Sequence, residues 1–106
     1  MGLCRRLHRA GMRLVSGADS GIGAAKRHGV LPYAVCELVT AGLGITDAPT
    51  TATSGAALAC GVGARKGRLV PGYDADLLVV DGHFETDVTA LQRPRSVLLR
   101  GLPISL

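Results

Sequence analysis

The stretch Arg13-Leu-Val-Ser-Gly-Ala-Asp-Ser-Gly21 decides how this chain is interpreted. Residues 12–16 form a short, mainly apolar run that predicts a buried strand, and a carboxylate, Asp19, follows it between two glycines. A strand that ends in a carboxylate can hold a catalytic group at the mouth of a sheet or barrel. Extended to Gly23, the same residues also fit a glycine-rich loop that cradles a phosphate at a helix N-terminus. The rest of the chain has to distinguish these two interpretations.

Length and composition describe a single domain or a piece of one. The chain has 106 residues, of which 47% are apolar and only 3% aromatic, so a core is available and would be built mainly from Leu, Val and Ala. The three cysteines, Cys4, Cys36 and Cys60, form no CxxC pair, which argues against a zinc ribbon or a redox motif. No signal sequence and no membrane-spanning run is visible. These features predict a reduced, cytoplasmic protein with buried, inert thiols and no membrane partner.

Charge is spread unevenly along the chain, which carries a formal net charge of +4. Basic residues crowd the first quarter (Arg5, Arg6, Arg9, Arg13, Lys26 and Arg27), and acidic residues gather late (Asp74, Asp76, Asp81, Glu85 and Asp87). Basic arms can hold nucleic acid, but here no aromatic residues alternate with the arginines to stack bases. The pattern therefore predicts a solvated helix face and no nucleic-acid partner.

The first part of the chain predicts mostly helices. Residues 2–10 have helical spacing of apolar positions and are followed by Gly11, which would end the helix. Pro32 is placed to begin a second helix that ends at Gly42. Thr46 is a plausible cap for a third helix, with Pro49 in its first turn, and residues 56–59 suggest a fourth that ends at Gly61.

The second part predicts strands. A Pro-Gly turn leads into the apolar run 77–80, which is typical of a strand buried on both faces. Residues 83–95 are polar and predict a loop with a short helical turn. Residues 96–100 predict a last strand, and residues 101–106 a possible edge. Lys66 and Arg68 flank a turn and are expected to face water.

Several motifs recur in the order found in one family. They are Ser16-Gly17-Ala18-Asp19, Asp47-Ala-Pro-Thr-Thr-Ala-Thr-Ser54, Ala56-Ala57, Gly67 through Asp81 and Val97 through Gly101. With these motifs the chain resembles the C-terminal third of metal-dependent amidohydrolases, in which a strand ending in Gly-Thr-Asp precedes an "ALxxAT" helix and a "GxIxxGxxADLxVxD" string. The most specific element is Gly72-Tyr-Asp-Ala-Asp-Leu-Leu-Val-Val-Asp-Gly82, and the resemblance is to the imidazolonepropionase-like and prolidase-like branch.

This resemblance implies an α/β fold. The family pairs a (β/α)₈ TIM-type barrel with a small β-sandwich, a composite domain built from both ends of the chain. By analogy, residues 12–19 would be the last barrel strand, and residues 1–62 would hold that strand with its flanking helices. Residues 63–106 would supply strands of the sandwich. In this arrangement Asp74 and Asp76 lie in a turn of the sandwich and have a structural role.

The resemblance also implies a chemistry. The family hydrolyses carbon–nitrogen bonds other than ordinary peptide bonds in small-molecule amides, including dipeptide-like ones, with a divalent metal, expected to be zinc. Asp19 matches the family's aspartate, which contacts the metal site and transfers protons. In the same motif Ala18 stands where the family usually has Thr, and in the following helix Pro49 stands where it usually has Leu. His28, which follows the loop of Asp19, is a candidate substrate contact, although a solvated loop histidine is the simpler interpretation. The full-length enzyme could be a homo-oligomer.

The other metal ligands of the family have no match in this chain. His8, His28 and His83 form no His-x-His pair, and a zinc site generally needs three or four protein ligands. We therefore expect a C-terminal fragment of a larger enzyme, inactive alone and without stoichiometric metal.

Two alternatives remain. One is a nicotinamide-dependent short-chain-dehydrogenase-like glycine loop at residues 16–23, but no acidic residue ends a second strand about 20 residues further on. That family's Tyr-x-x-x-Lys is also absent, since neither Tyr33 nor Tyr73 is followed by Lys at the fourth position. The other alternative is a non-enzymatic remnant that acts as an interaction module through exposed sheet edges.

Overall fold

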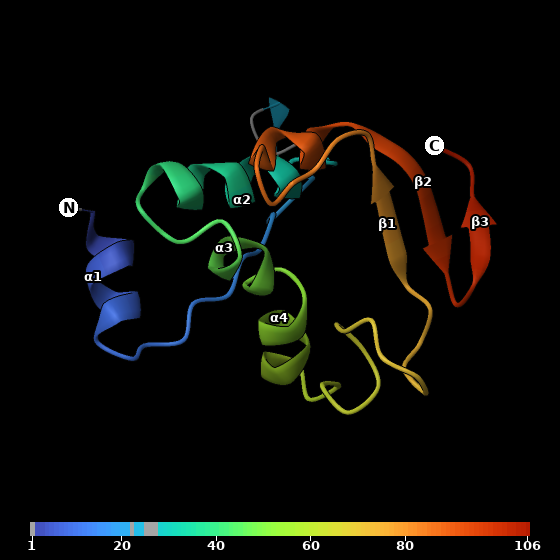
Figure 1. The fold of residues 1–106 in the computed structure, drawn as a ribbon, viewed down its shortest axis with the longest axis horizontal. Helices are drawn as coiled ribbons and strands as arrows, with labels where there is room; N and C mark the ends of the chain where they lie inside the picture. Colours follow the sequence, from blue (N-terminus) through green and yellow to red (C-terminus); the bar gives the residue numbers. More distant parts are fainter. Residues whose placement is uncertain (1, 22, 25–27) are drawn as a thin grey trace.

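The computed structural model of this protein describes residues 2–21, 23–24 and 28–106. Helices gather at one end of the molecule and a three-stranded antiparallel sheet stands at the other, which gives an α/β fold (Figure 1). The elements in chain order are α1 (Leu3–Arg9), α2 (Leu31–Thr40), α3 (Asp47–Thr50), α4 (Ser54–Ala59), β1 (Leu77–Val80), the 3₁₀ helix η2 (Val88–Gln92), β2 (Pro94–Leu99) and β3 (Leu102–Ile104). None of the helices in the described ranges is long and apolar enough to cross a lipid bilayer.

All four predicted helices are present. Helix α2 has Pro32 in its first turn, where a missing amide proton costs little, and it ends just before Gly42. Helix α3 begins after Thr46 and includes Pro49, as expected. The Thr46 side chain makes no capping bond; its carbonyl oxygen instead accepts a hydrogen bond from the Thr50 hydroxyl at 2.9 Å.

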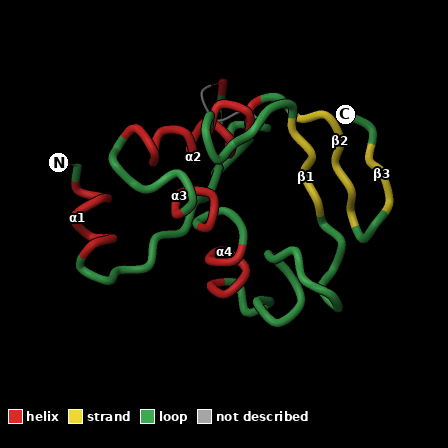
Figure 2. Tube along the Cα trace, in the orientation of Figure 1, coloured by secondary structure: helices red, strands yellow, loops and turns green. Residues whose placement is uncertain are grey.

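The strand predicted at residues 12–16 is not formed. Residues 12–19 run as a stretched loop from the end of α1 past α3 (Figure 2), and they pair with no other strand of the described chain. The prediction of burial was also wrong for two side chains, because Met12 is 53% exposed and Val15 is 49% exposed. A strand needs a neighbour to complete its hydrogen bonds, and β1, β2 and β3 all lie at the other end of the molecule.

The core is small and lies among the helices. Val35, Leu43 and Ala48 are buried together, and Cys4, Leu14, Leu38, Val39, Ala52, Val88 and Leu91 pack around them. It is built from Leu, Val and Ala, as the composition predicts. The prediction of buried thiols was wrong, since Cys4 and Cys36 are half-buried and Cys60 is exposed.

The sheet has the order β1-β2-β3, with Leu78 paired to Val97 and Val97 paired to Ile104. The turn between β2 and β3 contains Arg100 and Gly101, both with positive φ (49° and 79°), the combination that a tight type I′ hairpin requires. The prediction that β1 is buried on both faces was wrong, because Leu78 is 48% and Val79 is 43% exposed. The 3₁₀ helix η2 packs against β1, whereas α1 to α4 lie away from the sheet (Figure 1).

An ionic cluster ties together the loop that precedes β1. The Lys66 ammonium lies 2.7 Å from a carboxylate oxygen of Asp74 and 2.7 Å from one of Asp76. The other oxygen of Asp76 accepts a hydrogen bond from the backbone amide of Arg100 at 3.0 Å. This bond joins the loop to the β2–β3 turn. The Lys66 side chain is half-buried, with 27% of it exposed, and its ammonium is held by two carboxylates instead of being surrounded by water as predicted. The division of the chain at residues 62 and 63 stays a prediction.

Candidate functional site

Asp19 lies at the end of the stretched segment, exposed and with a left-handed backbone. Its φ is 49°, a conformation that costs most side chains on the order of 1 kcal/mol but that Asp and Asn tolerate better than others. Arg100 has the same φ, but there the hairpin turn accounts for it. Strained backbone in a non-glycine residue outside such a turn is often found at functional sites. The local geometry thus presents the Asp19 carboxylate at the surface.

His28 lies near the loop that carries Asp19. Its Nε2 atom is 3.9 Å from the position that a Cβ on Gly21 would take, and Gly21 is two residues beyond Asp19. His28 is exposed, so its imidazole can reach a solute outside the loop. The helix that a dinucleotide-binding loop would need after Gly23 includes residues 25–27, which lie outside the described part of the chain.

The described residues do not fit a metal ion by themselves. Among residues 2–21, 23–24 and 28–106, no group of three or more His, Cys, Asp or Glu side chains comes together. Zinc is normally held by three or four protein ligands. Asp19 alone supplies at most one.

The acidic pair Asp74 and Asp76 is held by cations rather than poised for acid–base chemistry. Hydrogen bonding from Lys66 lowers the pKa of both carboxyls, with a further contribution at Asp76 from the Arg100 amide. The hydrogen bond from Lys66 to Asp74, and to a smaller extent the one to Asp76, raises the pKa of Lys66. Both carboxyls are thereby kept ionised and tied to the loop, which supports the structural role expected for them.

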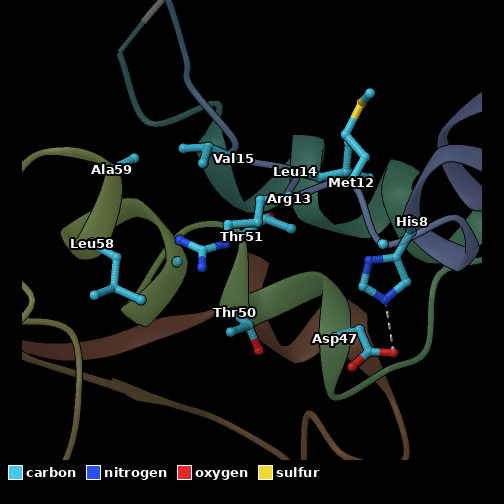
Figure 3. Close-up of a pocket in the computed structure, with 12 residues that line it drawn as sticks. His8, Met12, Arg13, Leu14, Val15, Asp47, Thr50, Thr51, Leu58 and Ala59 are labelled. Carbon is cyan, nitrogen blue, oxygen red and sulfur yellow. Dashed lines mark ion pairs between the residues drawn. The ribbon is translucent and has the colours of Figure 1, made fainter.

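A cavity that the sequence did not predict lies between the stretched segment and the helices α3 and α4 (Figure 3). It has a volume of about 360 Å³, and its lining is mixed. The apolar side chains are those of Met12, Leu14, Val15, Leu58 and Ala59, and the polar or charged ones those of His8, Arg13, Asp47, Thr50 and Thr51. On its rim the Nε2 atom of His8 faces Asp47 Oδ2 at 3.5 Å. His8 and Asp47 are far apart in the sequence and belong to no shared motif, so no sequence signal links them.

A second cavity lies between the same segment and α2. It has a volume of about 510 Å³, shares Leu14 and Val15 with the first, and includes Ser16, Gly17, Glu37 and Leu38 in its walls. The stretched segment is therefore bordered by two cavities, one toward α3 and α4 and one toward α2.

Solved structures of similar shape are hydrolases that are much longer than this chain. A Xaa-Pro dipeptidase with bound methionine matches with a TM-score of 0.86 and 24% identity over 97% of this chain and 25% of its own. A putative prolidase from Bifidobacterium longum matches with a TM-score of 0.82 and 29% identity over 97% of this chain and 25% of its own. An amidohydrolase matches with a TM-score of 0.83 and 30% identity over 95% of this chain and 24% of its own.

This chain thus spans about a quarter of the length of these structures. No curated protein matches it significantly. The model of the amidohydrolase family matches residues 3–101, which is nearly the whole sequence. The motifs around Asp19, α3 and β1 lie inside that range, and the prolidase and amidohydrolase structures share the fold. On this evidence the chain belongs to the amidohydrolase family.

Proposed function

We propose that this chain supplies the proton-transfer carboxylate of a hydrolase that cleaves carbon–nitrogen bonds in small-molecule amides. Family membership supports a hydrolase, and the dipeptidase and prolidase among the similar structures favour dipeptide-like amides as substrates. We also infer that residues 12–19 serve as the last strand of a (β/α)₈ barrel, with residues 63–106 in a small sandwich domain.

The observation that carries this proposal is the exposed Asp19 carboxylate at the end of the stretched segment, held in a left-handed conformation between glycines. Amide hydrolysis needs a base that takes one proton from the attacking water as its oxygen bonds to the carbonyl carbon. The carbon–nitrogen bond then breaks, and the leaving nitrogen must receive a proton. A single carboxylate can do both, by accepting the proton and returning it to nitrogen.

His28 is proposed as a substrate contact because its imidazole lies beside the same loop. A protonated or hydrogen-bonding imidazole there could orient a carboxylate or a carbonyl of the substrate. A divalent metal would have to be held chiefly by groups other than the described residues, and no step is assigned to it.

The experiment is a chimaera in which this chain replaces the matching quarter of the Bifidobacterium longum prolidase, assayed with a panel of Xaa-Pro dipeptides and N-acyl amino acids. Asp19→Asn keeps the size and the tolerance of positive φ but removes the base, so kcat should fall by about 10²- to 10⁴-fold. Asp81→Asn is the matched control, because Asp81 is also an exposed carboxylate but lies at the end of β1. Equal kcat values for the parent and the Asp19→Asn chimaera would refute the role of Asp19.

A further inference from the structure

The stretched segment that leads to Asp19 alternates between two environments. Leu14, Ser16 and Ala18 are half-buried, whereas the odd-numbered positions from 13 to 19 are exposed. This is the two-residue period of an extended chain, in which successive side chains point to opposite sides. The even-numbered side chains thus face the helices, and Asp19 lies on the open side.

Ser16 is the residue that bonds this segment to the helices. Its amide donates to the Thr51 carbonyl oxygen at 2.9 Å, and its hydroxyl oxygen lies 2.5 Å from that of Thr51. Thr51 is only 4% exposed, and its hydroxyl also donates to the Ala48 carbonyl oxygen at 2.6 Å. From residue 13 to residue 18 the backbone makes no other hydrogen bond with the part of the chain that the structure describes.

Apolar packing alone does not determine which residues of the segment face the helices. Leu14 packs against the core, but its neighbour Val15 is also apolar and could take its place if the segment slid by one residue. Such a slip exchanges the two sides of an extended chain. It would turn Asp19 toward the helices, where an unpaired carboxylate is costly.

The hydroxyl pair distinguishes the observed register from the slipped ones. After a slip by one residue, Val15 or Gly17 would face Thr51, and neither has a side-chain donor. The hydroxyl oxygen of a buried threonine would then lose a partner, which costs free energy. A buried polar contact can in this way select one arrangement among several that apolar contacts tolerate.

We propose that Ser16 and Thr51 are positioning residues for Asp19. Their hydrogen bonds fix the register of residues 13–19 on the helices, and this register keeps the Asp19 carboxylate on the open side, where a substrate can reach it. They act through the backbone, because Ser16 and Asp19 are separated by about 10 Å of extended chain. The inference rests on the proposed function of Asp19 and adds how the chain places that base.

The kinetic test uses the prolidase chimaera. Ser16→Ala and Thr51→Val should each lower kcat by about 10- to 100-fold, because a displacement of about 1 Å can cost a catalytic group that much rate. KM should change by less than about twofold, since no group that binds the substrate is removed. Thr51→Ser keeps the hydroxyl and should retain kcat within about threefold of the parent value. Thr50→Val is the matched control, because the Thr50 hydroxyl bonds to the Thr46 carbonyl oxygen and does not contact the segment.

A second measurement reports the register without turnover. Gly17→Cys and Ala18→Cys place a thiol on the exposed side and on the half-buried side of the segment, respectively. No atom lies within 4 Å of a Cβ on Gly17, so the first substitution is tolerated. Alkylation of each peptide is followed by mass spectrometry. The thiol at position 17 should react at least about threefold faster than the thiol at position 18, since access to the reagent limits the rate. Adding Thr51→Val should bring the two rates together.

An unchanged ratio of the two alkylation rates in Thr51→Val and Ser16→Ala overturns the proposal. It is also overturned if kcat stays at the parent value in both variants while Asp19→Asn is inactive, or if kcat falls only in proportion to the folded fraction measured by circular dichroism. Should Thr51→Val fail to fold, Ser16→Ala carries the same test at a half-buried position. A chimaera whose Asp19→Asn form is fully active refutes the proposed chemistry instead, and the alkylation rates then decide the register alone.

Discussion

Ser16 and Thr51 are joined at two points, although they lie on different elements. The Ser16 amide donates to the Thr51 carbonyl oxygen at 2.9 Å, and their hydroxyl oxygens are 2.5 Å apart. The Thr51 hydroxyl donates a hydrogen bond to the Ala48 carbonyl oxygen at 2.6 Å. Between the two hydroxyls, Ser16 is therefore the donor and Thr51 the acceptor. This pair ties the segment that leads to Asp19 to the end of α3.

Replacing Thr51 by Val should destabilise the chain and loosen the segment. Thr51 is only 4% exposed, and its loss leaves the Ser16 hydroxyl and the Ala48 carbonyl oxygen without this partner. We expect a loss of about 1–3 kcal/mol in the free energy of unfolding, measured by urea denaturation. Thr50→Val is the control, because Thr50 makes a similar bond to Thr46 but is exposed, so its effect should be smaller. Equal losses in the two variants would contradict this role for Thr51.

Gly67→Ala should be far more damaging than Gly72→Ala. Both glycines have positive φ, +91° and +88°, so an alanine at either position strains the backbone by a similar amount of free energy. A Cβ on Gly67 would lie 2.8 Å from the Thr53 carbonyl oxygen and 2.9 Å from the Ser54 Cα, whereas nothing lies within 4 Å of a Cβ on Gly72.

The two glycine variants are compared by their urea midpoints. Gly72→Ala should cost about 1 kcal/mol, and Gly67→Ala should cost more because the backbone at the start of α4 must move. A Gly67→Ala protein as stable as Gly72→Ala would show that this close approach does not exist in solution.

The Lys66 cluster should make stability depend on pH in the acid range. The pKa values of Asp74 and Asp76 are lowered in the folded chain, so their contribution is present above the unfolded pKa of about 3.9 and is lost as the pH falls through the folded values. The pKa of Lys66 is raised, so its contribution is present below about 10.4 and is lost as the pH rises beyond that. The carboxyls and Lys66 therefore both contribute to the free energy of unfolding between about pH 4 and pH 10.

Lys66→Met should flatten the acid part of this profile. Without the ammonium the two carboxyl pKa values return toward ordinary values, and the urea midpoint should change less between about pH 5 and pH 2. Arg68→Met is the control, because Arg68 is exposed and forms no ion pair with any described residue. A profile of Lys66→Met that overlays the parent's would show that the cluster does not form in solution.

The isolated 106-residue chain should retain no stoichiometric zinc after dialysis. In the described parts of the chain no three His, Cys, Asp or Glu side chains converge, and a zinc site needs three or four ligands. Elemental analysis by mass spectrometry measures the ratio directly. One tightly held zinc per chain, lost on Asp19→Asn, would mean that a metal site forms from this chain alone.

Much of the local structure could be predicted from neighbouring residues. Gly11 and Gly42 mark where helices end, and Pro32 marks where one begins, because their backbone preferences act over a single turn. The same holds for the Pro-Gly turn before β1. These preferences need no distant partner, so the positions of helices α1 to α4 and of β1 followed from the sequence.

Burial and pairing could not be predicted in this way. Residues 12–16 have the composition of a buried strand, but a strand forms only against a neighbour, and β1, β2 and β3 are elsewhere. Lys66 has the pattern of a solvated turn residue, but the fold brings Asp74 and Asp76 to it.

The sequence by itself determined the helices, the family motifs and the choice of Asp19 as the candidate base, because each depends on residue types at short spacing. Tertiary structure alone decided that Ser16 meets Thr51, that His8 meets Asp47, and that Val15 borders an open cavity. The first two contacts join residues 35 and 39 positions apart, and no local preference encodes any of the three; they arise only when packing brings the elements together.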